Sequence, residues 1–187
     1  MYKLIFFLLS LLLLSGCKNT KIKKVEIIPV TKIIDSLNYS KSELTLLIDK
    51  SDYQLSVLSG KNVVKVNPVV FGTDPVKDKL MEGDRRIPEG SFKVRDFYPH
   101  KSWSKFIWIN YPTEESFEKH NAAKESNMID ELASIGGEIG IHGTPLGKES
   151  LVLSKINWTW GCISMTNKDI NDLYQIIYKD MIIKFKK

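Results

Sequence analysis

Apolar residues recur in short, partly alternating runs along most of the chain after residue 42, a pattern that predicts β-strands. The runs span residues 43–49, 53–58, 63–71, 91–97, 106–111, 139–141 and 181–185. Polar turns at 49–52 and 59–62 separate the first three, as expected for consecutive hairpins. Pro68 cannot donate a ladder hydrogen bond, so we expect the third strand to lie at a sheet edge or to carry a bulge.

Two further stretches favour helices at the periphery of this sheet. Residues 112–135 are polar and compatible with a helix, and their candidate apolar anchors are Phe117, Met128, Ile129 and Leu132. Thr166 is placed to cap a second helix. The apolar face of that helix would carry Ile170, Leu173, Tyr174 and Ile177. The pattern as a whole predicts a mainly β domain with one or two peripheral helices.

The first 17 residues have the order of an export signal. Lys3 precedes an apolar run at 4–14, which small residues close at Ser15 and Gly16. The run is too short to span a bilayer comfortably. Residues 14–17 also resemble the bacterial lipobox, which implies that Cys17 becomes the lipidated first residue of the mature protein. The alternative is a plain signal peptide with an incidental cysteine at this position.

Residues 18–42 are predicted to be a tether between this anchor and a domain at 43–187. The segment is rich in Lys, Asn, Thr and Ser, and Pro29 interrupts it. Fully extended, such a segment reaches roughly 80 Å. Its apolar residues at 25–28 and 33–34 are unusual for a pure linker, and we expect them to pack on the domain.

The formal net charge of +5 is modest, and four lysines cluster in residues 18–24, where they would lie beside anionic lipid headgroups. The chain has no dense basic stripe interleaved with aromatic residues, so a nucleic-acid partner is not expected. Lys18 rather than an aspartate after the lipobox cysteine is typical of lipoproteins sent on to an outer membrane. The predicted location is therefore the cell envelope, on its periplasmic side, with the lipid anchor in the outer membrane.

Cys162 is the only cysteine of the predicted mature domain, and His142 precedes it by a loop. A thiol with a histidine available to activate it is the minimum equipment for cysteine acyl transfer. The alternative is a buried, inert thiol, since free cysteine is among the most buried residue types. Gly161 permits a close backbone approach, and the N–H groups around Gly161 and Cys162 are placed to stabilise an oxyanion. His100 and His120 lack ligand spacing to Cys162, so neither a metal nor another cofactor is predicted.

The segment 83–90 lies between predicted strands and contains two adjacent arginines, Arg85 and Arg86. Its glycines and proline are typical of a turn. Either arginine can grip a substrate carboxylate through a two-pronged hydrogen bond. The alternative, which the composition of the segment favours, is an arginine paired with Glu89 or Asp84.

Three motifs in this order resemble the YkuD-type L,D-transpeptidase family. The site motif reads His142-Gly143-Thr144 and then Thr159-Trp160-Gly161-Cys162-Ile163. Residues 48–57 resemble the opening hairpin of the family, and 83–90 resemble its Gly-Asp-x-Arg/Lys-Thr-Pro-Glu-Gly loop. Trp160 stands where most members have histidine, and Ile87 where threonine is usual. Asn157-Trp158-Thr159 before the cysteine resembles the YafK-like branch, whose members cross-link peptidoglycan or cleave its bond to an attached lipoprotein.

The resemblance implies an L,D-transpeptidase-like β-sandwich or barrel with one or two peripheral helices, and a role for several residues. Cys162 would be the nucleophile and His142 the general base, with the Gly143 carbonyl orienting the imidazole and the Gly161 backbone in the oxyanion hole. Arg86, Thr159 and Trp160 are the candidate substrate-binding residues. The substrates would be peptidoglycan stem peptides, attacked at diaminopimelate with loss of the terminal D-alanine.

Three functions remain open from the sequence. An active transpeptidase would pass the acyl group to an amine of a neighbouring stem. A hydrolase of the same fold, a carboxypeptidase, endopeptidase or amidase, would pass it to water, trimming stems or releasing wall-attached lipoprotein. A catalytically silent, wall-binding lipoprotein is the alternative from another class. Neither the oligomeric state nor the acceptor follows from the sequence.

Overall fold

The computed structural model describes residues 28–187, so the predicted signal peptide, Cys17 and the lysines at 18–24 lie outside the described residues. One mixed sheet forms the domain, with the strand order β3-β2-β1-β8-β4-β5-β6-β7. The strands are β1 (Leu44–Asp49), β2 (Gln54–Ser59), β3 (Asn62–Pro68), β4 (Gly90–His100), β5 (Ser104–Ile109), β6 (Gly140–His142), β7 (Ile163–Ser164) and β8 (Ile182–Lys186). The mainly β prediction is confirmed, and so are the seven predicted strands, with shifts at their ends. Only β7, two residues long, was not expected.

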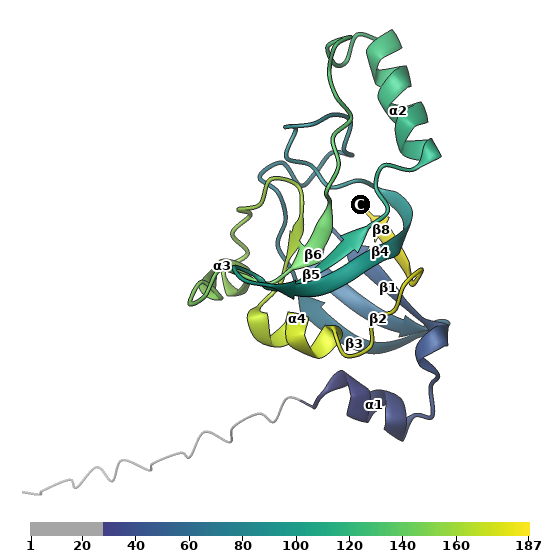
Figure 1. Cartoon of the computed structure of the whole chain (residues 1–187), viewed down its shortest axis with the longest axis vertical. Helices are drawn as coiled ribbons and strands as arrows, with labels where there is room; N and C mark the ends of the chain where they lie inside the picture. The colour runs from purple at the N-terminus through teal and green to yellow at the C-terminus, as the bar shows by residue number, and fades with distance from the viewer. Residues whose placement is uncertain (1–27) are drawn as a thin grey trace, which may run out of the picture.

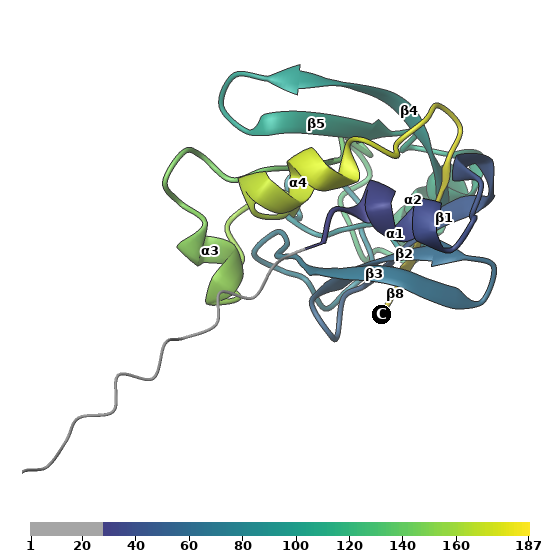
Figure 2. The same cartoon turned by 90° about the horizontal axis from the view of Figure 1, so that it is seen from below.

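The long strand β4 divides the sheet into two layers that face each other across the core (Figure 1, Figure 2). Its first part, Gly90 to Lys93, pairs with β8, and its second part, from Val94 onward, pairs with β5. Pro68 ends β3 at one edge of the sheet, as predicted. Just beyond it, Val70 and Ser164 exchange two backbone hydrogen bonds of 2.8 Å, so the chain after β3 meets β7 and partly closes the sheet on itself.

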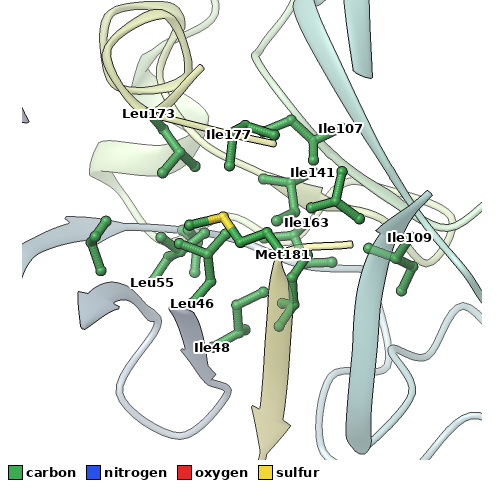
Figure 3. Packing of buried hydrophobic residues seen from close by; sticks show 14 of the residues in the cluster. Leu46, Ile48, Leu55, Ile107, Ile109, Ile141, Ile163, Leu173, Ile177 and Met181 are labelled. Carbon is green, nitrogen blue, oxygen red and sulfur yellow. The ribbon is translucent and has the colours of Figure 1, made fainter. Parts of the chain in front are cut away.

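The core lies between the two layers and is built from the inward positions of the strands (Figure 3). Each strand contributes alternate apolar residues because successive side chains of a strand point to opposite faces. Representative members, all at most 1% exposed, are Leu46, Ile48, Leu55, Ile107, Ile109, Ile141, Ile163, Leu173 and Met181. Burial of this apolar surface is the main favourable contribution to folding.

The helices are α1 (Val30–Ser36), α2 (Glu114–Glu125), α3 (Ser150–Leu153) and α4 (Asn167–Leu173), with a 3-10 turn at Lys41–Glu43. Thr166 caps α4 as predicted, and its side chain accepts a hydrogen bond from Asp169 N–H. The expectation for 112–135 was wrong in extent and in its anchors. Phe117, Met128 and Leu132 are 47%, 69% and 93% exposed. The arm that carries α2 extends away from the sheet (Figure 1), and polar contacts attach it, including His120 Nδ1 to the Leu80 carbonyl at 2.6 Å.

Part of the segment expected to be a tether packs on the domain. Val30 and Ile34 of α1 are buried, and the Val30 N–H donates to Asp172 Oδ1 at 3.0 Å. Lys65 Nζ joins the same carboxylate at 2.7 Å. The apolar residues at 33–34 therefore pack on the domain, as their composition suggested. The tether expectation now concerns residues 18–27, which lie outside the described part.

Candidate active site

Strands β6 and β7 place His142 and Cys162 on the same face of the sheet. The two strands are parallel, with Ile141 opposite Ile163 and His142 opposite Ser164. Ile141 and Ile163 are buried in the core, and side chains alternate along a strand, so His142 points to the other face. Cys162 directly precedes β7 and, by the same alternation, shares that face. The strand register thus brings two residues that are far apart in sequence to one face of the sheet.

A cavity of about 250 Å³ opens on this face beside Cys162. We call it the Cys162 cavity; its lining residues are Tyr98, His100, Trp103, Phe106, Trp108, Glu138 and Cys162. Across the sheet, Trp108 of β5 lies opposite Gly140 of β6. Gly140 presents no side chain, and an added Cβ would lie 2.4 Å from the Phe106 ring. The sequence analysis did not predict the aromatic lining, although aromatic and histidine residues at the even positions 98, 100, 106 and 108, within and just beyond two predicted strands, carried the signal.

His142 is held in one orientation and shielded from water. Its Nδ1 lies 2.7 Å from the Gly143 carbonyl oxygen. A carbonyl can only accept, so Nδ1 carries the proton and Nε2 is left as the basic nitrogen. The ring stacks on Trp103 at 4.4 Å between centroids and lies parallel to Phe106 at 6.0 Å, while Trp158 meets it at 81°.

The same enclosure makes His142 a weak base. Burial lowers the pKa of the imidazole to about 4, more than the hydrogen bond to Gly143 raises it, and His100 adds a small lowering contribution. The residue is 2% exposed. At neutral pH His142 is therefore uncharged, which is the form that accepts a proton.

Cys162 is the complementary acid. Its Sγ lies 3.6 Å from the Glu138 carbonyl oxygen, and the residue keeps part of its surface open. Burial of the sulfur raises the pKa of the thiol to about 11, although a hydrogen bond from Gly140 and the charge of Lys79 act in the opposite direction. The resting site thus contains a neutral thiol and a neutral imidazole rather than a preformed ion pair.

Hydrogen bonds to the buried Thr159 side chain stabilise the turn before Cys162. Thr159 is 3% exposed, and its hydroxyl donates to the Cys162 carbonyl at 2.6 Å. The Gly161 N–H reaches the same hydroxyl at 3.4 Å, and Gly161 has a φ of +130°, which favours glycine. The structure therefore places the Thr159 side chain inside the turn, outside the lining of the Cys162 cavity.

Trp160 and the arginines lie beside this turn rather than in the cavity lining. Trp160 is 78% exposed, and the Arg85 guanidinium lies 5.1 Å from its ring centroid. Arg86 Nε donates to Asp74 at 2.8 Å. The expected pairing of an arginine side chain with Glu89 or Asp84 was wrong. Glu89 pairs with Lys50, and Asp84 with the buried Lys79. Lys50 is 39 residues away from Glu89, a contact that local sequence cannot reveal, whereas Lys79 lies only five residues before Asp84.

No group of three His, Cys, Asp or Glu side chains that could hold a metal ion occurs within residues 28–187. His120, whose spacing to Cys162 already argued against a ligand role, instead binds the Leu80 carbonyl from the outer arm. In the same part of the chain, no helix has the length and apolar character needed to cross a membrane.

The family follows from comparison with known proteins. The model of the L,D-transpeptidase catalytic domain, YkuD, matches residues 43–184. The chain belongs to this family. No curated protein matches the sequence.

Solved structures share the fold at low identity. The helical cell shape determining protein Pgp2 from Campylobacter jejuni has a TM-score of 0.58 and 19% identity, over 84% of this chain and 55% of Pgp2. Bdellovibrio bacteriovorus Bd1075 has a TM-score of 0.52 and 18% identity, over 76% of this chain and 47% of Bd1075. An L,D-transpeptidase from Xylanimonas cellulosilytica has a TM-score of 0.50 and 15% identity, over 86% of this chain and 71% of that structure. The chain thus spans about half the length of the first two structures.

Proposed function

We propose that this protein is a cysteine-dependent peptidoglycan L,D-transpeptidase that acts on stem peptides through an acyl-enzyme at Cys162. The observation that carries the proposal is the position of Cys162 and His142 on one face of adjacent strands, with His142 Nδ1 bound to the Gly143 carbonyl. This orientation leaves Nε2 free to take the thiol proton. Membership of the L,D-transpeptidase family supports the choice of peptidoglycan as substrate.

The neutral resting pair defines the proton path. Nε2 of His142 takes the Cys162 proton as the sulfur attacks the carbonyl at the L-centre of diaminopimelate. The backbone N–H of Cys162 would stabilise the oxyanion, and the Gly161 N–H, which donates to the Thr159 hydroxyl in the resting site, would have to turn towards the oxyanion to join it. The imidazolium then returns the proton to the departing D-alanine amine, which leaves a thioester. An acceptor amine attacks the thioester, gives its surplus proton to His142 and releases the thiol.

A direct test incubates the full-length chain in detergent with disaccharide-tetrapeptides and identifies the products by mass spectrometry. A cross-linked dimer lacking one D-alanine supports transfer. Shortened monomers alone assign the protein to the hydrolase of the same fold. Cys162→Ala is the control, and absence of any Cys162-dependent product with all wall fragments would contradict both enzymes and leave the wall-binding lipoprotein. Acylation of Cys162 by a carbapenem tests the nucleophile independently.

The proposal extends to the place of action. Lipidation at Cys17 would attach the domain to a membrane, and Lys18 favours the outer membrane. Masses of the mature N-terminal peptide, with and without a Cys17→Ala change, test this anchor. An unmodified peptide beginning elsewhere would support the plain signal peptide instead.

A further inference from the structure

Trp108 lines the Cys162 cavity, and its indole N–H has no hydrogen-bond partner among the described residues. Trp108 Nε1 is buried and makes no hydrogen bond to any of residues 28–187. A buried donor left without an acceptor costs free energy, so such a group in a binding cavity is a candidate for contact with a ligand. Trp108 lines the same cavity as Cys162.

The strand register places Trp108 and Cys162 in one row across three strands. Trp108 lies opposite Gly140, and Gly140 precedes Ile141, which lies opposite Ile163 just after Cys162. The Phe106 ring fills the space over Gly140 and lines the Cys162 cavity together with Trp108 and Cys162. A ligand in this cavity would contact Trp108 at one end and Cys162 at the other.

A β-bulge brings a positive charge to the same indole. The pairing of β4 with β5 slips between Val94 and Asp96, which makes Arg95 the extra residue. Bulges of this kind redirect a side chain. The Arg95 guanidinium lies 4.3 Å from the Trp108 ring centroid, and Arg95 has no ion pair among the described residues.

We propose that Trp108 and Arg95 form a subsite for a carboxylate of the substrate. This carboxylate would lie next to the carbon that Cys162 attacks. The indole N–H would donate to the carboxylate, and the guanidinium would add positive potential behind the ring. Glu138 lines the same cavity with the opposite charge, but its exposed side chain is screened by water, whereas the Trp108 donor is buried. The identification of the carboxylate as one borne by a stem peptide rests on the proposed function.

Alkylation of Cys162 tests the subsite without a wall substrate. Iodoacetate carries a carboxylate one carbon from its reactive centre, and iodoacetamide is its neutral counterpart. The ratio of their rate constants, measured on the full-length chain at a single pH, reports anion preference and cancels changes in thiol reactivity. We expect Trp108→Phe, which keeps the ring and removes the N–H, to lower the iodoacetate-to-iodoacetamide ratio about tenfold. Arg95→Gln should lower it several-fold.

Lys101→Gln is the matched control, because it removes one exposed positive charge from the same hairpin outside the cavity lining. Its ratio should equal that of the unchanged protein. Unchanged ratios in both Trp108→Phe and Arg95→Gln would overturn the subsite, as would an equal fall in Lys101→Gln. If the ratios fall and no wall fragment is converted, the subsite stands and the proposed function fails. If wall fragments are converted and the ratios stay unchanged, the proposed function stands and the subsite fails.

Discussion

The indole of Trp103 stacks on the imidazole of His142 with centroids 4.4 Å apart and an angle of 24° between the rings. The same residue accepts a hydrogen bond from the Gly143 N–H at 2.9 Å through its backbone carbonyl. Trp103 therefore acts on His142 in two ways: its ring shields the imidazole from water, and its carbonyl holds Gly143, the residue whose own carbonyl binds Nδ1. It is a positioning residue of the proposed mechanism.

Replacing Trp103 with leucine should move the acid limb of the pH profile. Burial lowers the pKa of His142 to about 4. Removal of the indole admits water, so this pKa should rise towards the ordinary value of about 6.5. The pH below which kcat/KM falls should rise with it. Tyr98→Leu alters the same cavity but removes no ring stacked on His142, and its profile should keep the original limb. Coincident profiles for all three proteins would contradict the positioning role.

Unfolding free energy should depend on pH through His142. The folded protein protonates this imidazole only near pH 4, and the unfolded chain does so near 6.5, so the unfolded state binds more protons between these values. The contribution of His142 to stability is complete above about pH 6.5 and falls by about 3 kcal/mol as the pH drops to 4. Urea unfolding at pH 7 and pH 4.5 measures the change. His142→Gln should lose most of this dependence, and an unaltered dependence would speak against a buried neutral imidazole.

Alkylation of Cys162 should be slow at neutral pH and accelerate far into the alkaline range. Burial raises the pKa of the thiol to about 11, so only a small fraction is thiolate at pH 7. The iodoacetamide rate constant should increase about tenfold for each pH unit from 7 to 10. Cys162→Ala corrects for modification of other side chains. A plateau already reached at pH 7 would instead indicate a thiolate–imidazolium pair.

A methyl group at Gly143 should disturb the orientation of the base. Its Cβ would lie 2.1 Å from Asn167 Oδ1 and 2.6 Å from the Trp103 carbonyl, so the peptide must shift. We expect Gly143→Ala to lower kcat at least about tenfold and to reduce the unfolding free energy by about 1–3 kcal/mol. An added Cβ at Gly137 meets nothing within 4 Å, which makes Gly137→Ala the matched control. Full activity in Gly143→Ala would remove the carbonyl from the mechanism.

Trp160 should affect the fate of the acyl-enzyme more than its formation. The side chain is 78% exposed beside the nucleophile turn and is absent from the lining of the Cys162 cavity. Trp160→Ala should change the unfolding free energy by no more than about 0.5 kcal/mol. Carbapenem acylation of Cys162 should keep its rate, whereas cross-linked dimer should fall relative to hydrolysed monomer. A product ratio equal to that of the unchanged protein would exclude a role for Trp160 in acceptor binding.

Local sequence was sufficient to predict most strands, because the alternation of apolar and polar residues and the turn residues depend on only a few neighbouring positions. It also identified Cys162 and His142, since both lie in short motifs. It failed for the 112–135 arm, where a polar helix is attached through His120 and Lys119 rather than through the apolar residues expected to anchor it. It also failed for the partners of Glu89 and Asp84, which are Lys50 and Lys79 rather than the arginines of the segment 83–90.

The sequence alone therefore determined the mainly β class and the cap at Thr166, and it selected a thiol and a histidine as the candidate catalytic pair. Only the tertiary structure decided what surrounds them. The parallel register of β6 and β7 brings His142 to the face of Cys162, and the β4–β5 hairpin supplies Trp103 and Trp108. Burial then sets the pKa values of both groups. These properties depend on strand pairing between distant segments, which periodicity within any one segment cannot encode.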